Sequence, residues 1–381
     1  MFKQTQFNKR KQLRFRRWSR KGYAIFVSRH YEVIMSECTA SVSSGFLPKT
    51  KSIKKQMLSV SQLEEKVLSG ERLTEEEALW LALHAEKEAL YAAANRIREH
   101  FCGNKMDLCT ILNAKSGKCS EDCKWCSQSA HHKTNIQVYD LVNPQEAFQQ
   151  AKHNEAAGAH KFSLVTSGRA ISHHHLDKLC KIYSDLKKET PKLELCASMG
   201  LLDREKMQKL VETGVKNYHC NIETAPSFFS ELCSTHTTEE KIETIRIARD
   251  LGMGICSGGI IGMGETMEQR VEMALTLQEL EVESIPLNIL NPIEGTKLEN
   301  QSPLTDEEIL TTIAVFRFVN PKAMIRFAGG RNLILHIQDK ALKAGINAAL
   351  IGDLLTTIGS KGMKQDIEDF KTAGFDVARS N

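Results

Sequence analysis

Three cysteines stand close together in the segment Cys119-Ser-Glu-Asp-Cys123-Lys-Trp-Cys126, which has C-x3-C-x2-C spacing. Thiolate is a soft, anionic ligand, so three of them on one short loop can surround a single metal centre. An iron–sulfur cluster with four irons is usually held by four cysteines. Three ligands would leave one iron open, and an open iron can bind a substrate as well as pass electrons. The spacing therefore predicts a catalytic 4Fe–4S cluster.

Zinc is the alternative metal for three close cysteines, with His131 or His132 as the fourth ligand. Structural zinc sites usually pair one C-x2-C motif with a second pair of ligands, and this sequence has no second cysteine pair. A zinc-stabilised binding protein is therefore the competing hypothesis from a different class. It predicts a protein that binds zinc and carries no iron.

The composition is that of a globular protein, with 381 residues of which 41% are hydrophobic and 26% are charged. The sequence contains no run of 18 apolar residues, which argues against a membrane-spanning helix. The N-terminus shows no clear signal peptide, and an odd set of 11 cysteines is not a secreted disulfide framework. We therefore expect a cytoplasmic protein with reduced thiols.

Residues 1–56 differ from the rest of the chain in charge, with 14 Lys and Arg against two acids, a net charge of +12. Because the whole chain carries +4, the remaining residues carry −8, which argues against a nucleic-acid surface on the folded part. A basic arm for nucleic acid, an organelle presequence and an over-long gene model all fit this segment. Since it has no folding pattern, we favour a disordered or mis-annotated extension.

From about Met106, short apolar β-branched runs alternate with amphipathic stretches of helical periodicity. The candidate strands are Leu108–Asn113, Lys161–Thr166, Leu193–Ser198, Asn217–Ile222, Gly254–Ile260, Ser284–Leu290, Met324–Ala328 and Ala348–Gly352. The candidate helices begin at Asn143-Pro144 and lie near 173–189, 203–213, 238–251, 266–280, 305–319 and 362–372. Eight strand–helix repeats predict an α/β fold, the (β/α)8 TIM-type barrel, and an open doubly wound sheet is the competing fold. In either fold the loops after the strands should hold the site.

Two helical stretches precede the first strand, Val60–Ser69 and Thr74–Ala93. The second begins with Thr74-Glu-Glu-Glu77, which predicts a capping box at its first turn. We therefore divide the chain into the basic extension 1–56, an N-terminal helical extension over 57–105 and a barrel over 106–377.

The three-cysteine loop directly after the first strand resembles that of the radical S-adenosylmethionine superfamily. In that superfamily the open iron binds S-adenosylmethionine, and an electron from the reduced cluster releases methionine and a 5′-deoxyadenosyl radical. The resemblance implies that Cys119, Cys123 and Cys126 hold a 4Fe–4S cluster. Trp125 matches the aromatic residue that commonly precedes the last cysteine.

Further stretches over residues 60–377 resemble the biotin synthase family within this superfamily. They are Leu112-Asn-Ala-Lys-Ser-Gly-Lys-Cys119, Cys126-Ser-Gln-Ser129, Tyr218-His-Cys-Asn-Ile-Glu-Thr224, Cys256-Ser-Gly-Gly-Ile-Ile-Gly-Met-Gly-Glu265, Ser284-Ile-Pro-Leu-Asn-Ile-Leu290 and Ile325-Arg-Phe-Ala-Gly-Gly-Arg331. The resemblance implies sulfur insertion between C6 and C9 of dethiobiotin. Both carbons are unactivated, so a radical of this strength is needed to abstract their hydrogens.

In that family a second, 2Fe–2S cluster inside the barrel is the proposed sulfur donor, held by three cysteines and an arginine. Cys196, Cys256 and Arg326 match three of these positions and lie on the third, fifth and seventh candidate strands. Alternate strands of a barrel contribute one layer of inward-pointing residues, which suits a shared set of ligands. The resemblance therefore implies that these three residues hold the second cluster.

The fourth position departs from the family pattern, because Ser163 stands where the family usually has cysteine. Three explanations stay open: Ser163 ligates iron directly, Cys220 substitutes from the fourth strand, or an exogenous group fills the place. The departure also keeps open a different radical reaction, such as a cofactor-maturation step. The remaining cysteines match no ligand position and have packing as their default role; they are Cys102, Cys109, Cys180 and Cys233.

The segment from Gly258 to Glu265 carries three further glycines between a strand and a helix, where backbone can approach a ligand closely. In the family this segment lies against the adenine of S-adenosylmethionine, which implies a role for Gly258, Gly262 and Glu265. Asn221 and Glu223 match residues that contact its ribose, although the family pattern has Asp where Glu223 stands.

Asn288 matches the residue that bonds the ureido ring of dethiobiotin. The resemblance further implies an external reducing partner, such as flavodoxin or ferredoxin, and a homodimer. We expect neither nucleic acid nor a membrane among the partners.

Overall fold

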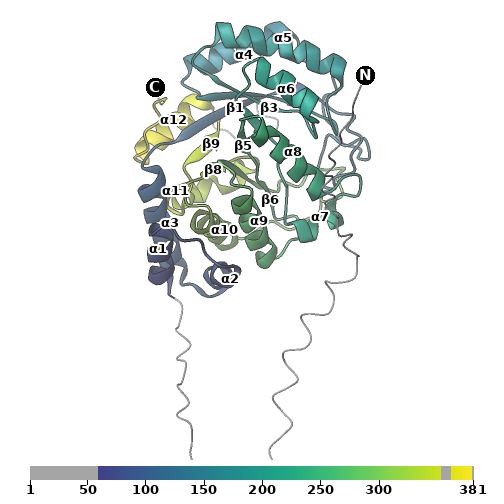
Figure 1. Cartoon of the computed structure of the whole chain (residues 1–381). Helices are drawn as coiled ribbons and strands as arrows, with labels where there is room; N and C mark the ends of the chain where they lie inside the picture. Colours follow the sequence, from purple (N-terminus) through teal and green to yellow (C-terminus); the bar gives the residue numbers. More distant parts are fainter. Residues whose placement is uncertain (1–58, 353–361, 380–381) are drawn as a thin grey trace, which may run out of the picture. The chain divides into compact units, whose positions relative to one another are not determined.

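The structure is a computed structural model that describes residues 59–352 and 362–379, so the predicted extension 1–56 lies outside the described residues. Strands and helices alternate along the described chain (Figure 1). The strands are β1 (Asp107–Lys115), β2 (Lys161–Thr166), β3 (Glu194–Ser198), β4 (Asn217–His219), β5 (Gly254–Cys256), β6 (Gly259–Ile261), β7 (Ser284–Ile289), β8 (Met324–Phe327) and β9 (Ala348–Leu350). The helices are α1 (Val60–Leu68), α2 (Glu75–His84), α3 (Lys87–Cys102), α4 (Pro144–Ala156), α5 (His173–Glu189), α6 (Arg204–Glu212), α7 (Pro226–Leu232), α8 (Thr238–Asp250), α9 (Met267–Glu279), α10 (Asp306–Val319), the 3-10 helix η1 (Arg331–Ile337), α11 (Gln338–Lys343) and α12 (Met363–Thr372).

The strands form one parallel sheet in the order β5-β4-β3-β2-β1-β9-β8-β7-β6, and β5 also pairs with β7. That last pairing joins Cys256 to Ser284 and closes the sheet into a barrel, with β5 and β6 as two pieces of one barrel strand. The helices that follow the strands lie around the outside of the sheet (Figure 1). The (β/α)8 TIM-type barrel is confirmed, and the open doubly wound sheet is excluded because the sheet closes.

The predicted strand Gly254–Ile260 was wrong in one respect, because it is divided into β5 and β6. At Gly258 the chain passes so close to β7 that a Cβ atom would lie 2.1 Å from the Pro286 carbonyl oxygen. The Gly258 carbonyl also accepts the Glu223 N–H at 3.0 Å, so the backbone leaves the strand path here. Close approach without a side chain is what glycine permits.

The predicted helix Thr74–Ala93 was also wrong, because two helices occupy this stretch. Ala85 is extended, with φ −67° and ψ 144°, and ends α2. The Glu86 side chain then caps α3 by accepting the N–H groups of Glu88 and Ala89. The capping box predicted at Thr74 and Glu77 is present at the start of α2.

Helices α7 and α11 were not predicted. Both are short, with seven residues in α7 and six in α11, so neither holds two full turns of helical periodicity from which it could be recognised. In the part of the chain that the structure describes, no helix is long and apolar enough to cross a lipid bilayer.

Arg317 on α10 is fully buried and ties this helix to the loops that lead into β8 and β9. Its guanidinium donates to the Gly345 carbonyl at 2.7 Å, to the Ala323 carbonyl at 2.8 Å and to Asn347 Oδ1 at 2.7 Å. Asn347 Oδ1 in turn accepts the Ile325 N–H at 2.9 Å. The Arg317 guanidinium therefore supplies hydrogen-bond donors to buried acceptors in the loops just before β8 and β9. Burial lowers the pKa of Arg317.

We predict that Arg317→Met lowers the free energy of unfolding by about 3 kcal/mol, because the apolar side chain leaves buried carbonyl groups without donors. Anaerobic urea unfolding followed by circular dichroism measures the change. Arg204→Met is the control, since Arg204 pairs with Asp250 on the surface and should change stability by less than about 1 kcal/mol. Equal losses in the two variants would contradict the role given to Arg317.

Candidate active site and metal centres

The loop with the three cysteines follows β1 and folds back on itself. The Cys119 N–H donates to the Gln128 carbonyl at 3.0 Å, and the Ala130 N–H donates to the Cys119 carbonyl at 2.8 Å. A tighter turn inside the loop is closed by the Cys126 N–H and the Cys123 carbonyl, 3.0 Å apart. The structure therefore brings together the three residues that the C-x3-C-x2-C spacing singled out.

These cysteines line a cavity, here called the outer cavity, at the carboxyl ends of the first four strands. Its volume is about 980 Å³, including the part open to solvent. Trp125, Asn221 and Glu223 line the same cavity, so three of the six residues predicted to hold S-adenosylmethionine lie with the cysteines. The wall also contains charged or titratable groups that the sequence analysis missed, namely Glu121, Arg169, His236 and Lys241.

In the outer cavity, the thiols of Cys123 and Cys126 have pKa values raised above the usual range, which favours their protonated form. Burial raises the pKa of Cys126 to about 11, with a smaller contribution from Cys119 beside it. The hydrogen bond to Cys233 and burial raise the pKa of Cys123 still further. Iron must therefore displace protons, so cluster assembly should weaken as the pH falls. Crowded thiols in a poorly solvated place are a suitable ligand set for a cationic metal centre.

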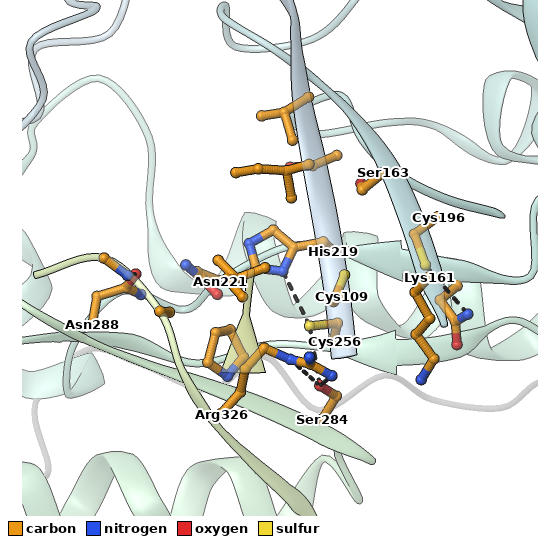
Figure 2. Close-up of a pocket in the computed structure, with 18 residues that line it drawn as sticks. Cys109, Lys161, Ser163, Cys196, His219, Asn221, Cys256, Ser284, Asn288 and Arg326 are labelled. Carbon is orange, nitrogen blue, oxygen red and sulfur yellow. Dashed lines mark hydrogen bonds between the residues drawn. The ribbon is translucent and has the colours of Figure 1, made fainter. Parts of the chain in front are cut away.

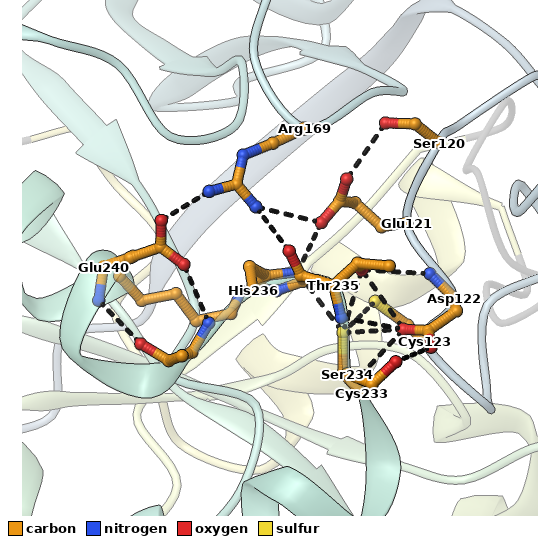
Figure 3. A network of polar contacts seen from close by, with 12 residues as sticks. Ser120, Glu121, Asp122, Cys123, Arg169, Cys233, Ser234, Thr235, His236 and Glu240 are labelled. Atoms are coloured by element: carbon orange, nitrogen blue, oxygen red, sulfur yellow. Dashed lines mark hydrogen bonds and ion pairs between the residues drawn. The ribbon is translucent and has the colours of Figure 1, made fainter.

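The segment between α7 and α8 holds the cysteine loop in place through Asp122 (Figure 3). The Asp122 carboxylate accepts the Ser234 N–H at 2.9 Å, the Thr235 hydroxyl at 3.1 Å and, at close range, the Ser234 hydroxyl. Burial acts to raise the Asp122 pKa, but the hydrogen bonds from Ser234 outweigh it and hold this pKa well below its usual range. Asp122 is therefore an ionised anchor next to Cys123.

A second anchor forms at the buried Glu121, whose Oε2 accepts a hydrogen bond from His236 Nδ1 at 2.7 Å. Arg169 lies between this pair and Glu240, donating to Glu121 at 3.3 Å and pairing with Glu240 at the start of α8 (Figure 3). Burial and Lys241 lower the His236 pKa despite the carboxylate. The two anchors fix the loop that carries the cysteines against the barrel.

Cys233 lies beside the cysteine loop, with its Sγ 3.6 Å from Cys123 Sγ and 3.3 Å from His236 Nδ1. No local signal could have found this neighbour, because Cys123 and Cys233 are far apart in the sequence. His131 and His132, the candidate zinc ligands, instead contact backbone carbonyl groups through Nε2 at 3.0 Å and Nδ1 at 2.8 Å.

A second cavity, here called the barrel cavity, lies inside the sheet and has a volume of about 1050 Å³ with its opening (Figure 2). Ser163, Cys196, Cys256, Arg326 and Asn288 all line it, so the residues matched to the second cluster and to dethiobiotin converge on one space. Several other polar groups in this wall were not predicted from the sequence; they are Cys109, Lys161, Asn217, His219 and Ser284.

Buried charges form the floor of the barrel cavity. Arg326 is 2% exposed and donates to Asp107 Oδ1 at 2.5 Å and to the Ala349 carbonyl at 3.1 Å. Lys161 lies 3.1 Å from the other Asp107 oxygen. Burial opposes ionisation of Asp107, but these two cations hold its pKa well below the usual range. The alternation of Lys161 with Ser163 along β2 was the available sequence signal for an inward-pointing lysine.

The Ser163 hydroxyl points into the barrel cavity and is 4% exposed, and its Oγ has no hydrogen-bond partner within the described ranges. Buried polar atoms are usually paired, so an orphan here indicates a missing ligand. Cys220, the alternative ligand, does not line the barrel cavity; it borders the outer cavity instead.

In the glycine-rich segment after β5, the Glu265 side chain is engaged within its own loop and by α9. Its carboxylate accepts the N–H groups of Gly262 and Met263 and the Arg270 guanidinium, each at 2.7 Å. Gly258, Gly262 and Glu265 are also absent from the described linings of both cavities. These three hydrogen bonds let the Glu265 carboxylate shape the loop, and its contact with S-adenosylmethionine stays a prediction.

The closed barrel and the three-cysteine loop define the class of this protein, and comparison with known families agrees. Residues 114–277 match the radical SAM superfamily, and residues 286–376 match the biotin and thiamin synthesis associated domain. The chain is therefore a radical S-adenosylmethionine enzyme.

Individual relatives narrow this class further. The chain is 52% identical over 324 residues to a biotin synthase of Parabacteroides distasonis, covering 85% of this chain and 98% of that protein. It is 53% identical over 319 residues to a biotin synthase of Porphyromonas gingivalis, covering 84% and 96%. A Clostridium botulinum biotin synthase is 51% identical over 321 residues, covering 84% and 100%. The chain belongs to the biotin synthase family, and the zinc-binding hypothesis is not favoured.

Solved structures share the fold at lower sequence identity. Methylornithine synthase superimposes with a TM-score of 0.71 at 22% identity, covering 84% of this chain and 97% of that one. The FeFe-hydrogenase maturase HydG from Carboxydothermus hydrogenoformans gives 0.69 at 18% identity, covering 83% and 78%. These likenesses show the shared barrel and carry nothing about substrate.

We predict that Asp122→Ala loosens the cysteine loop and lowers stability by roughly 1–2 kcal/mol, because the Ser234 and Thr235 donors lose their acceptor. The iron retained after anaerobic gel filtration should fall as well. The contribution of Asp122 is present above its ordinary pKa of 3.8 and is lost as the pH falls toward the lowered folded value.

Asp185→Ala is the matched control for this variant, since Asp185 is an exposed residue of α5 that pairs only loosely with Lys188, at 3.9 Å. It should retain the iron of the unaltered protein. If Asp122→Ala behaved like this control, the loop would not depend on the anchor.

Proposed function

We propose that this chain makes biotin from dethiobiotin by radical sulfur insertion, with a 4Fe–4S cluster held by Cys119, Cys123 and Cys126. The observation that carries the proposal is the convergence of these three thiols on one cavity next to Asn221 and Glu223. Three soft ligands on one loop suit such a cluster and leave one of its irons for S-adenosylmethionine. Family membership supports the same assignment.

When bound, the reduced 4Fe–4S cluster supplies the electron that cleaves S-adenosylmethionine, and a second cluster supplies the sulfur. We assign the binding of S-adenosylmethionine to Trp125, Asn221 and Glu223 around the outer cavity. Asn221 Oδ1 accepts the Gly258 N–H at 3.0 Å, and its Nδ2 lies 3.4 Å from Glu223 Oε2. This bond fixes the amide, and the carboxylate next to it can accept hydrogen bonds from ribose hydroxyls. We assign Gly258 and Gly262 a supporting role, because their backbone N–H groups donate to Asn221 and Glu265 and so shape the loop after β5.

Glu223 has two features of a residue committed to a ligand. Its backbone has a positive φ of 73°, which is unusual for a residue with a side chain and marks a functional constraint. Burial raises the pKa of its carboxyl group, although Lys241 at 3.9 Å acts in the opposite direction. A partly desolvated carboxyl of this kind forms stronger hydrogen bonds to a bound hydroxyl than an exposed one.

We assign the second cluster to Cys196, Cys256 and Arg326 in the barrel cavity, where the orphan Ser163 hydroxyl supports the presence of a ligand. Dethiobiotin would occupy the neighbouring space and contact Asn288. The Asn288 amide donates to the Gly259 carbonyl at 2.9 Å and accepts the Gly329 N–H at 2.8 Å. Each amide atom keeps one further hydrogen-bonding position for a ureido ring.

We also propose an electron donor, a cellular compartment and an oligomeric state for this enzyme. The chemistry requires a one-electron donor, for which a reduced flavodoxin or ferredoxin is the suitable class. We further propose that the enzyme works in the cytoplasm, where its many thiols stay reduced, and that it forms a homodimer.

The function is tested by anaerobic reconstitution with iron and sulfide, followed by an assay of biotin and 5′-deoxyadenosine from dethiobiotin, S-adenosylmethionine and a reductant. We predict that the unaltered protein forms both products and that Cys123→Ala loses both, because one cluster ligand is gone. Cys180→Ala is the control, since Cys180 lies on α5 away from both cavities and should keep the activity. Formation of 5′-deoxyadenosine without biotin would indicate a different radical reaction.

Glu223→Gln tests the assignment of the ribose contact. We predict that it raises the KM for S-adenosylmethionine about tenfold or more, since a hydrogen bond to a charged group contributes roughly 1.5–3 kcal/mol. The iron content should not change, because Glu223 holds no iron in this assignment. An unchanged KM would remove Glu223 from the binding site.

A further inference from the structure

Cys109 lies on β1 and faces the interior of the barrel. It borders the barrel cavity together with Ile111, two residues further along the same strand, as the alternation of a strand requires. In register it stands beside Lys161 of β2 and Leu350 of β9, both of which border the same cavity. The sequence analysis gave Cys109 only a packing role, because it matches no ligand position of the family.

The Cys109 thiol lies among the residues assigned to the second cluster. Cys196, Cys256 and Arg326 line the same cavity, and Cys256 and Arg326 both contact the Ser284 hydroxyl, at 3.4 Å each. Figure 2 shows the Cys109 side chain between those of Cys196 and Cys256, above the Arg326 guanidinium. Three thiols and one guanidinium from four different strands therefore surround one part of the cavity.

The two other candidates for the fourth place are less well suited. Ser163 pairs with Ile111 in register, one inward-facing step further along the barrel than Cys109. A serine hydroxyl is a hard ligand that ionises with difficulty, whereas a thiolate suits iron in a sulfide cluster. Cys220 borders the outer cavity and packs with the hydrophobic core.

A packing role explains Cys109 poorly. An inert buried cysteine normally sits among apolar side chains as a small hydrophobic group. Cys109 instead lies on a cavity wall that Arg326 also lines, two residues after Asp107, the ion-pair partner of Arg326. Its position indicates a ligand.

We propose that Cys109 is the third thiolate ligand of the second cluster, which it holds together with Cys196, Cys256 and Arg326. This inference rests on the proposed function, because it assumes that a second cluster is present. Cys109 thereby replaces the cysteine that the family has at the position of Ser163. The cluster lies one step deeper in the barrel as a result, next to the Asp107–Arg326 ion pair. Ser163 is left outside the ligand set, and its free hydroxyl can donate a hydrogen bond to a cluster sulfide.

The test compares three variants after anaerobic reconstitution, measuring iron and sulfide per chain together with Mössbauer and visible absorption spectra. Cys109→Ala is expected to lose the iron and sulfide of the second cluster, about two of each for a 2Fe–2S centre, and its spectral signature. It should keep the first cluster and still cleave S-adenosylmethionine, while biotin formation is lost. Ser163→Ala is expected to keep the second cluster, and Cys180→Ala is the control for loss of an unrelated thiol.

The double variant Cys109→Ala/Ser163→Cys adds a rescue. It moves the thiolate to the position usual in the family, so the second cluster should return. Cys109→Ser, which keeps the size of the side chain, serves if Cys109→Ala does not fold, and it should show the same loss of second-cluster iron.

The inference is overturned if Cys109→Ala or Cys109→Ser retains the second cluster, or if Ser163→Ala loses it. Those results leave the proposed function intact, because the unaltered protein would still hold two clusters and form biotin. If instead the unaltered protein never acquires a second cluster, the proposed function itself fails, and the inference fails with it.

Discussion

The pairing of β5 with β7, which joins Cys256 to Ser284, is the constraint on which both cavities depend. Without it the sheet would stay open, and the inward side chains of its two ends could not face each other. Closure places Cys256 of β5 beside Ser284 of β7, so that Cys256 lines the same interior as Cys196 and Arg326. Asp107 meets Arg326 for a different reason, because β1 and β8 both pair with β9. An iron–sulfur centre requires several soft ligands at one point, and a closed ring of strands supplies them from separate positions.

The interior of the barrel contains charged side chains, and ion pairs between them stabilise it. Asp107, Lys161 and Arg326 are all largely buried, and each would be costly to bury alone. Arg326 is pinned by Asp107 and a backbone carbonyl, so its guanidinium has a fixed place in the cavity. The same network that stabilises the floor therefore orients one of the proposed cluster ligands.

The two cavities deliver their ligands by different means. The outer cavity draws its cysteines from one loop, whose shape depends on the anchors at Glu121 and Asp122 from the segment before α8. The barrel cavity draws its cysteines from separate strands, whose positions are fixed by the sheet. The shape of the outer cavity therefore depends on a few polar contacts to one loop, whereas that of the barrel cavity depends on the pairing of the whole sheet.

The sequence by itself determined the alternation of strands with helices and the three-cysteine loop, because both signals are local; the closure of the sheet into a barrel was decided by the tertiary pairing of β5 with β7. Strand periodicity marked β2 at its observed bounds, and spacing marked Cys119, Cys123 and Cys126. It failed where tertiary contacts override local pattern, as at Gly258, where the chain leaves the strand to pass Pro286. Only the tertiary structure decided the neighbours of the cysteine loop, such as Cys233, since no spacing relates residues on distant elements.

The fourth place of the second ligand set shows the same division. From the sequence, Ser163 and Cys220 were the two candidate protein ligands for this place. Ser163 stands where the family pattern has cysteine, and Cys220 lies on the fourth candidate strand, from which it could substitute. In the structure Cys220 borders the outer cavity, whereas Cys109 lines the barrel cavity together with Cys196. Which side chain reaches a common interior depends on strand register and barrel closure, and both are set by the packing of the whole sheet.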